Sequence, residues 1–295
     1  MSSSHRSSII EAPCKISSMR KDLGLNPSGG SKHKKPKHCH FSILYNELPF
    51  LKQKLPFLYK HFDQLIFYDL NILDNTFSND GSHEFIKEFY DPDKKITLIE
   101  KTDLSNIKYK KAVSFEKKSQ MFTVGSWYVR DEIDYFWCTD MDEFFNTSLI
   151  TSVEQNIGPK ETAFVPHVVF FQNEHHIGSK DGYTLIPFPY TRVAKHTPGY
   201  IYGHCTLHTK FNPKQIQDII YHFAFVGKQR MKFKKELYKS NDPIFDLELR
   251  DDEVINFSAL NAECVELYDQ IVLNTYIFPD YIDINVLMSD LCAQR

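Results

Sequence analysis

The sequence contains no apolar run near the roughly 18 to 20 residues that a helix needs to span a bilayer. Residues 1–6 lead into no long apolar segment, so we expect no secretory signal. Net charge is also small, at −3 over 295 residues, and provides no overall field that would attract nucleic acid. Neither a transmembrane protein nor a nucleic-acid-binding protein is therefore expected.

Paired cysteines are missing as well. The six cysteines are scattered along the chain, and none forms a Cys-x-x-Cys pair that could bind zinc or act in redox chemistry. We interpret them as mostly reduced thiols, which is typical of a cytoplasmic protein. Cys138 lies within an apolar run and is expected to be a small core residue.

Residues 1–38 have too few apolar side chains to fold and are predicted to be a disordered tail. The tail is rich in Ser, Gly and Pro, and residues 32–38 form a basic run. One interpretation is a solvated tail. The other is electrostatic contact with an anionic membrane surface, which would make the protein peripheral to a membrane.

From Cys39 onward the chain has the composition of a folded domain, with 42% hydrophobic and 14% aromatic residues overall. Apolar strands alternate with helical patterns up to residue 145, which predicts right-handed crossovers and a mostly parallel central sheet flanked by helices. The fold class is therefore α/β. The expected strands are 40–45, 64–69, 95–100 and 133–139, and the expected helices are 48–62, 83–90 and 112–129.

The pattern changes beyond residue 145. We expect a short helix at 149–156, extended segments at 162–165, 168–171, 185–193, 205–211 and 219–225, and a polar loop at 172–178. Helical periodicity predicts a helical C-terminal region, with helices at 232–239, 260–276 and 282–291. No internal repeat is found, so residues 39–295 are interpreted as one domain.

The most informative stretch is 135–145, where an apolar strand ends in acidic residues. Asp140 and Asp142 are two residues apart, and in an extended chain such side chains share a face. Both carboxylates can then reach one hard cation, and oxygen ligands suit Mg²⁺ or Mn²⁺. Such a cation would neutralise a diphosphate. The alternative is an Asp-x-Asp that occurs by chance in an acidic loop.

Two earlier strands also end in polar side chains. Asn46 and Glu47 follow the first strand, and Asp69 ends the second. Ligand sites in open α/β sheets lie beyond the carboxyl ends of the strands, so we expect these residues along the same edge as the Asp pair. The alternative is that they are ordinary loop residues.

These features together resemble the GT-A-fold nucleotide-sugar glycosyltransferases, near the large family 2 and its relatives with an Asp-x-Asp-Glu-Phe motif. The most specific part is the segment from Asp140 to Phe144, and the resemblance covers about residues 39–235. It implies a nucleotide-sugar half at 39–145, an acceptor half at 146–235 and a helical C-terminal region at 236–295. One departure is that Asp69 is separated from Ser78 and Asp80 by a longer segment than is usual in family 2.

The resemblance also assigns site residues. Asp140 and Asp142 would hold Mn²⁺ or Mg²⁺, with His222 as the third ligand, although a lone His in an apolar run is as readily a core residue. The remaining donor-binding residues would be Asn46, Glu47 and Asp69 around the nucleoside, Gln120 and Lys118 (or Lys117) near the nucleotide, and Lys228 and Arg230 at the leaving diphosphate.

The activity implied is transfer of a hexose from a UDP- or GDP-sugar to a hydroxyl of a glycan, lipid or protein acceptor, with inversion. An inverting reaction needs a base for the acceptor hydroxyl. Glu174 is the candidate, with His175 and Asp181 as alternatives, and Glu143 would orient the donor sugar.

Two other classes stay open. A metal-dependent phosphatase of the HAD type also has an apolar strand that ends in Asp-x-Asp, but its nucleophile strand normally comes first in the core. A catalytically inactive carbohydrate-binding or scaffold protein could keep the same fold. Phosphate release without a sugar acceptor would favour the phosphatase, and sugar-nucleotide binding without turnover would favour the inactive protein.

Overall fold

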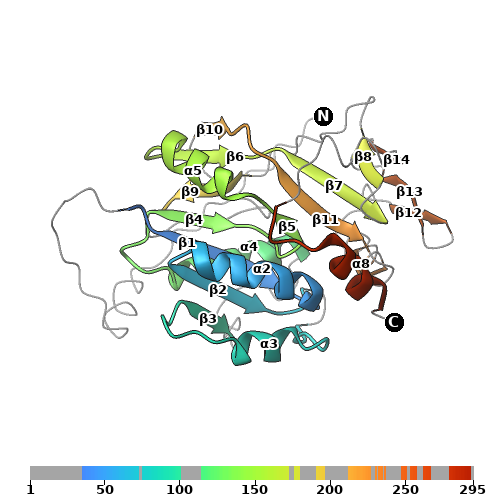
Figure 1. Ribbon diagram of the computed structural model, residues 1–295, viewed down its shortest axis with the longest axis horizontal. Coiled ribbons are helices and arrows are strands. Elements are labelled where there is room, and N and C mark those ends of the chain that lie inside the picture. The colour runs from blue at the N-terminus through green and yellow to red at the C-terminus, as the bar shows by residue number, and fades with distance from the viewer. Residues whose placement is uncertain are drawn as a thin grey trace, which may run out of the picture. The chain divides into compact units, whose positions relative to one another are not determined.

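Four parallel strands form one side of the first sheet in the computed structural model (Figure 1). They lie in the order β4-β1-β2-β3. The strands are β1 (His38–Leu44), β2 (Gln64–Asp69), β3 (Ile96–Ile99) and β4 (Tyr135–Cys138), and the helices that connect them are α2 (Leu48–His61), α3 (Ser82–Glu88) and α4 (Ser114–Trp127). The strands and helices predicted between residues 40 and 139 are confirmed.

The structure describes part of the chain, and Pro36–Arg295 form one compact unit. The described residues are 35–72, 75–100, 114–172, 176–179, 191–196, 212–226, 230, 232–234, 236, 247–250, 253–257, 262–266 and 279–293. The predicted tail lies almost entirely outside them. Its expected boundary at residue 38 is slightly late, because His38 is already part of β1.

Strands β1, β2 and β4 are buried on both faces, which explains their apolar composition. Alternate residues of β1 enter different apolar clusters. Phe41 joins the cluster formed with α4, and Leu44 joins the cluster formed with α2. In the view of Figure 1, α2 lies in front of β1 and β2, and α4 lies behind them. The sheet therefore has a helix on each face.

Three strands from the second half of the chain complete the first sheet. Strand β9 (Thr191–Lys195) is antiparallel to β4, β6 (Glu161–Phe164) is antiparallel to β9, and β10 (Asn212–Gln215) is parallel to β6. The result is a seven-stranded, mostly parallel mixed sheet. The predicted α/β class is confirmed, and the more specific GT-A assignment stays a prediction.

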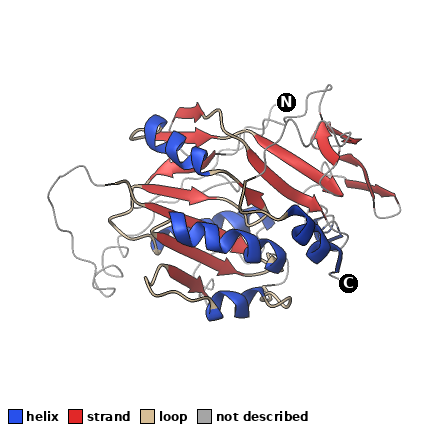
Figure 2. Ribbon diagram, viewed as in Figure 1, coloured by secondary structure: helices blue, strands red, loops and turns tan. Residues whose placement is uncertain are grey.

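A second, mostly antiparallel sheet begins just after β4 (Figure 2). Its order is β12-β13-β14-β8-β7-β11-β5, and only β7 and β11 are parallel neighbours. The bounds are β5 (Glu143–Phe144), β7 (His167–Gln172), β8 (His176–Ser179), β11 (Ile220–Val226), β12 (Leu247–Arg250), β13 (Glu253–Phe257) and β14 (Ala262–Glu266). Because only four residues separate β4 from β5, the second sheet reaches the edge where the acids lie. Helix α5 (Thr147–Asn156) follows β5, as predicted.

The helical C-terminal region is wrong between residues 247 and 266, where the described residues form strands. The expected helix at 260–276 contains β14, and two further strands, β12 and β13, precede it. Strand β14 pairs with β8, which lies far away in sequence and within the predicted polar loop 172–178. Local periodicity cannot register such a partner. Only the last helix is confirmed, as α8 (Ile284–Ala293).

Helix α8 lies against α2, where Lys52 pairs with Asp290 and the Asp283 amide donates to the Gln53 side chain at 3.2 Å. The predicted helix at 232–239 is described only in part, and Lys232, Phe233 and Lys234 are helical. The extended segment predicted at 205–211 lies outside the described residues. Among the helices that the structure describes, none is both long and apolar enough to cross a bilayer.

Gly125 is required by the approach of α4 to the sheet. A Cβ at this position would lie 2.1 Å from Cε2 of Phe41, whose ring is fully buried in β1. Glycine in the interior of this helix is therefore a packing requirement. The helix loses some intrinsic stability at Gly125 and gains a close contact with the core.

Gly125→Ala should lower the free energy of unfolding by about 2 kcal/mol, because overpacking outweighs the gain of about 1 kcal/mol in helix propensity. Urea denaturation of both proteins would measure the difference. Gly158→Ala is a matched control, since the added Cβ would meet only the flexible carboxylate end of Glu161, at 3.3 Å. Equal stability of Gly125→Ala and the unmodified protein would contradict the close approach.

Candidate functional site

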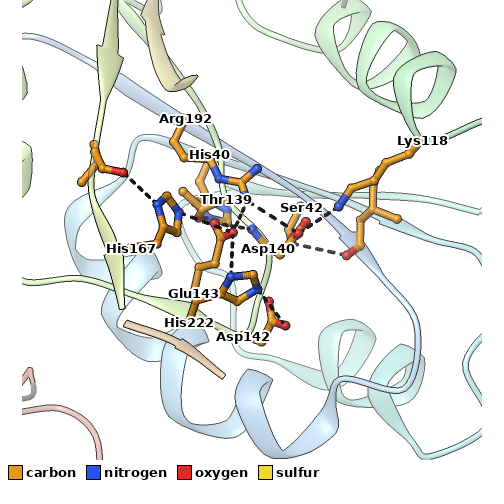
Figure 3. Close-up of polar contacts among 12 residues, drawn as sticks. His40, Ser42, Lys118, Thr139, Asp140, Asp142, Glu143, His167, Arg192 and His222 are labelled. Carbon is orange, nitrogen blue, oxygen red and sulfur yellow. Dashed lines mark hydrogen bonds and ion pairs between the residues drawn. The ribbon is translucent and has the colours of Figure 1, made fainter. Parts of the chain in front are cut away.

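Residues 139–142 join β4 to β5 and place Asp140 and Asp142 at the carboxyl end of β4 (Figure 3). The connection is tight, because the Glu143 amide donates to the Asp140 carbonyl at 3.1 Å. The second sheet holds it from the other side, where the Phe223 amide of β11 donates to the Asp142 carbonyl at 2.8 Å. The acidic residues thus lie at the junction of the two sheets.

Asp140 is the more accessible of the two aspartates, with 15% of its side chain exposed. Lys118 of α4 donates to its Oδ2 at 2.9 Å, as Figure 3 shows. Burial opposes ionisation of this carboxyl group, but Lys118 and Arg192 outweigh it and hold the pKa of Asp140 below its usual value. Asp140 is therefore a carboxylate at neutral pH.

Asp142 is fully buried and has two basic partners. Arg230 is ion-paired with Oδ2, and His222 Nε2 of β11 lies 3.4 Å from the same oxygen. Burial again opposes ionisation, and Arg230 and His222 nevertheless keep the pKa of Asp142 well below its usual range. The structure thus brings together three predicted site residues that lie far apart in sequence.

Glu143 is also fully buried and faces three basic side chains (Figure 3). Arg192 of β9 is ion-paired with its Oε1, His167 Nε2 of β7 lies 3.7 Å from that oxygen, and His222 Nδ1 lies 3.9 Å from it. The other oxygen accepts a hydrogen bond from the Asp140 amide at 3.2 Å. Glu143 therefore fixes the elements around the Asp pair, and its predicted contact with a donor sugar stays a prediction.

The chemistry of Asp142 and His222 fits a divalent cation. Carboxylate oxygens are the usual protein ligands of Mg²⁺ and Mn²⁺, and the neutral imidazole nitrogen is a common ligand of metal ions in general. Asp142 Oδ1 is buried and accepts no hydrogen bond from any described residue, so this oxygen has a lone pair to offer a ligand. Within the described part of the chain, however, no three His, Cys, Asp or Glu side chains form a ready metal site. The metal stays a prediction.

A buried lysine that was not predicted from the sequence also holds the segment between β4 and β5. Lys54 of α2 is fully buried, and its Nζ donates to Thr139 Oγ1 at 3.1 Å and to the Asp140 carbonyl at 2.7 Å. His40 Nε2 of β1 is hydrogen-bonded to the same threonine hydroxyl at 2.6 Å. Burial, opposed by the nearby carboxylates, lowers the pKa of Lys54 to about 8.

Sequence signals for the unpredicted residues differ in strength. Lys54 lies at helical spacing from Phe50 and Leu58, so it interrupts an apolar face and could have been recognised as a buried charge with a partner. His167 and Arg192 lie at the start of β7 and β9, strands that contain other polar residues as well. No local signal distinguishes them from surface residues, because their common partner is the distant Glu143.

A second network joins the ends of β1 and β2. Asp69 is fully buried, and its Oδ1 accepts hydrogen bonds from the Ser78 amide at 3.0 Å and hydroxyl at 2.6 Å. Its Oδ2 lies 2.8 Å from His83 Nδ1. Ser78 Oγ in turn accepts from the Asn46 amide at 2.9 Å. The longer segment after Asp69 therefore returns to it, and the expected nucleoside contacts of Asn46 and Asp69 stay predictions.

The start of α2 belongs to the same network. Asp80 Oδ2 accepts from the Leu48 amide at 3.0 Å, and Ser82 Oγ accepts from the Glu47 amide at 2.9 Å. These contacts satisfy amides that a helix N-terminus leaves open. Gly81 makes this geometry available with a φ of +91°, which favours glycine.

Glu47 connects this network to the Asp pair through Arg230, which donates to Glu47 Oε1 at 2.9 Å while it pairs with Asp142. Burial, opposed chiefly by Arg230, raises the pKa of Glu47 to about 7. Gln120 lies on α4, two residues after Lys118, and its nucleotide contact stays a prediction. The predicted residues outside the described side chains are Lys117, Glu174, His175, Asp181 and Lys228.

A scan of the chain against protein-family models found no match, and neither did a comparison with curated proteins.

Lys54→Ala should lower the free energy of unfolding by about 3 kcal/mol, because it leaves a cavity and removes two buried hydrogen bonds. Lys54→Met keeps the apolar stem beside Phe145 and should cost about 2 kcal/mol, since it leaves no large cavity but still removes the two hydrogen bonds. Urea denaturation would give both values. If methionine were as costly as alanine, the hydrogen bonds of Lys54 would dominate and the stem would contribute little.

Proposed function

We propose that this chain is a metal-dependent glycosyltransferase. It transfers a sugar from a nucleotide-diphosphate sugar, of the UDP or GDP type, to a hydroxyl of a glycan, lipid or protein acceptor. Mn²⁺ or Mg²⁺ is held by Asp140, Asp142 and His222. The reaction inverts the anomeric centre, as the resemblance to family 2 of the GT-A fold implies.

The observation that carries this proposal is the position of His222 beside the Asp pair. Its Nε2 lies 3.4 Å from Asp142 Oδ2, although 80 residues separate the two along the sequence. An Asp-x-Asp alone is common, but an Asp-x-Asp beyond a parallel strand that also meets an imidazole is a specific donor set for a divalent cation.

The bound cation would supply Lewis-acid stabilisation of the diphosphate that leaves with the nucleoside. Basic side chains of this chain supply further positive charge at the same place. Lys118 contacts Asp140, and Arg230 contacts Asp142. Such preorganised cations stabilise the charge that develops on the leaving group.

The elements around the site hold its groups in place. Glu143 binds the Asp140 amide and pairs with Arg192, and Lys54 binds the Asp140 carbonyl. Both peptide groups of Asp140 are thus held by buried side chains, which limits the movement of its carboxylate. Precise placement of reacting groups is worth several orders of magnitude in rate. The proposed base for the acceptor hydroxyl is Glu174.

Purified protein incubated with UDP-, GDP- and dTDP-sugars should bind or slowly hydrolyse one donor class, and only when Mn²⁺ or Mg²⁺ is present. Asp142→Asn should reduce the rate by about 100-fold or more, because it removes a charged ligand of the cation. The amide keeps the shape of the side chain, so the comparison is less affected by unfolding than alanine would be. Isothermal calorimetry and release of free sugar are the measurements.

Asp290→Asn is the matched control, since Asp290 is a carboxylate on α8 that pairs with Lys52 at the surface. Its donor binding and hydrolysis should equal those of the unmodified protein. A folded Asp142→Asn protein with normal turnover would reject the proposal. Phosphate release from a simple ester with no sugar donor would instead favour the phosphatase.

His222→Ala should weaken Mn²⁺ binding by about 10- to 100-fold, because the cation loses one ligand of its set. Binding is measured in the presence of the nucleoside diphosphate by Mn²⁺ electron paramagnetic resonance. His61→Ala is a suitable control, because His61 ends α2 and so lies toward the opposite edge of the sheet. Unchanged Mn²⁺ affinity of His222→Ala would remove His222 from the metal site.

A further inference from the structure

Arg230 bridges two acidic residues from different parts of the chain. Its Nη1 donates to Glu47 Oε1 at 2.9 Å, at the end of β1, and its Nη2 is ion-paired with Asp142 Oδ2, beyond β4. The guanidinium lies 4.9 Å from the ring centroid of Phe50, and 10% of the side chain is exposed. Asp142 is therefore paired with a cation of the protein itself.

The other carboxylates of the site have basic partners too. Lys118 pairs with Asp140, Arg192 pairs with Glu143, and both Lys54 and Lys234 act electrostatically on Asp142. Among the described side chains, the lysines and arginines that act on these acids at least equal the acids in number. The acids thus have no uncompensated negative charge to offer a divalent cation.

Adding a divalent cation to a balanced, poorly hydrated cluster is unfavourable, because like charges repel strongly where the effective dielectric constant is low. Two changes relieve this repulsion. A cation of the protein can leave Asp142, or an anion can enter together with the metal. Arg230 can take part in both changes. It can leave Asp142, and it can then bind an entering phosphate, because a guanidinium matches the geometry of phosphate oxygens as well as that of a carboxylate.

We propose that Arg230 is a built-in counter-cation of Asp142 that the divalent cation displaces, and that the freed guanidinium then binds the diphosphate of the donor. This inference rests on the proposed function. Glu47 keeps the other arm of the guanidinium close to the site during the exchange. Metal and nucleoside diphosphate consequently bind together, each strengthening the other.

This coupling is reciprocal, because a nucleotide that tightens metal binding must itself be tightened by the metal to the same degree. In the nucleotide-free protein, Mn²⁺ competes with Arg230 for Asp142 and binds weakly. Removing Arg230 removes the competitor and also a phosphate ligand. Two opposite effects therefore follow from one substitution, and a residue that only stabilised the fold would not produce them.

The experiment is titration of Mn²⁺ into the full-length protein, followed by electron paramagnetic resonance, without nucleotide and with saturating UDP or GDP. Arg230→Gln should bind Mn²⁺ alone about tenfold tighter than the unmodified protein, because the ion pair that competes with Mn²⁺ for Asp142 is lost. The factor by which UDP or GDP tightens Mn²⁺ binding should fall by about the same amount. Lys52→Gln, at a surface ion pair with Asp290, should change neither value.

Arg230→Gln leaves Glu47 without its charged partner and could lower the stability of the protein. The double variant Glu47→Gln/Arg230→Gln removes both charges and should show the same tighter binding of Mn²⁺ alone. Circular dichroism would show that each variant is folded at the temperature of the titration. Agreement of the single and double variants would support the exchange at Asp142.

The outcomes separate the inference from the proposed function. If both Arg230 variants bind Mn²⁺ alone no tighter than the unmodified protein, while Asp142→Asn abolishes Mn²⁺ binding, the exchange is refuted and the metal site stands. If neither the unmodified protein nor any variant binds Mn²⁺, with or without UDP and GDP, both the exchange and the metal-dependent function are refuted. Tighter binding of Mn²⁺ alone with reduced nucleotide coupling supports the exchange.

Discussion

Burial of carboxylates at the carboxyl end of β4 is the constraint on which the surrounding structure depends. Asp142 and Glu143 have no exposed surface, and a carboxylate in such a place is tolerated only with charged and hydrogen-bonding partners. The partners come from distant segments: Arg192 from β9, His222 from β11, and Arg230 from the residues after β11. Satisfying these acids therefore joins the two sheets.

The same requirement explains features that local reasoning would treat as defects. A lysine on the apolar face of α2 is costly unless its ammonium group has partners, and Lys54 finds them in Thr139 and the Asp140 carbonyl. Asp69 is equally buried and is satisfied by Ser78 and His83, which return to it after an intervening loop. Each buried charge specifies where another segment of the chain must lie.

Arg230 links these two polar networks. Its guanidinium contacts the Glu47 carboxylate and the Asp142 carboxylate beyond β4. The amide of Glu47 donates to the Ser82 hydroxyl at the start of α2. Binding of a cation at Asp142 would thus alter the contact of Glu47, because one guanidinium pairs with both side chains. This geometry gives the proposed exchange a physical route from the metal ligands to the expected donor pocket, because a single rigid, planar group contacts both.

The sequence by itself determined the α/β class, the strands and helices from β1 to β4, and the position of Asp140 and Asp142 beyond a buried strand. These features depend on local periodicity and on strand polarity, which are present in a short stretch of residues. Tertiary structure decided the strands β12–β14, the place of β8, and the partners of Glu143. Strand pairing and ion pairing join residues distant in sequence, so no local pattern contains them. The helix predicted at 260–276 failed for that reason, since β14 is held by β8 and β13.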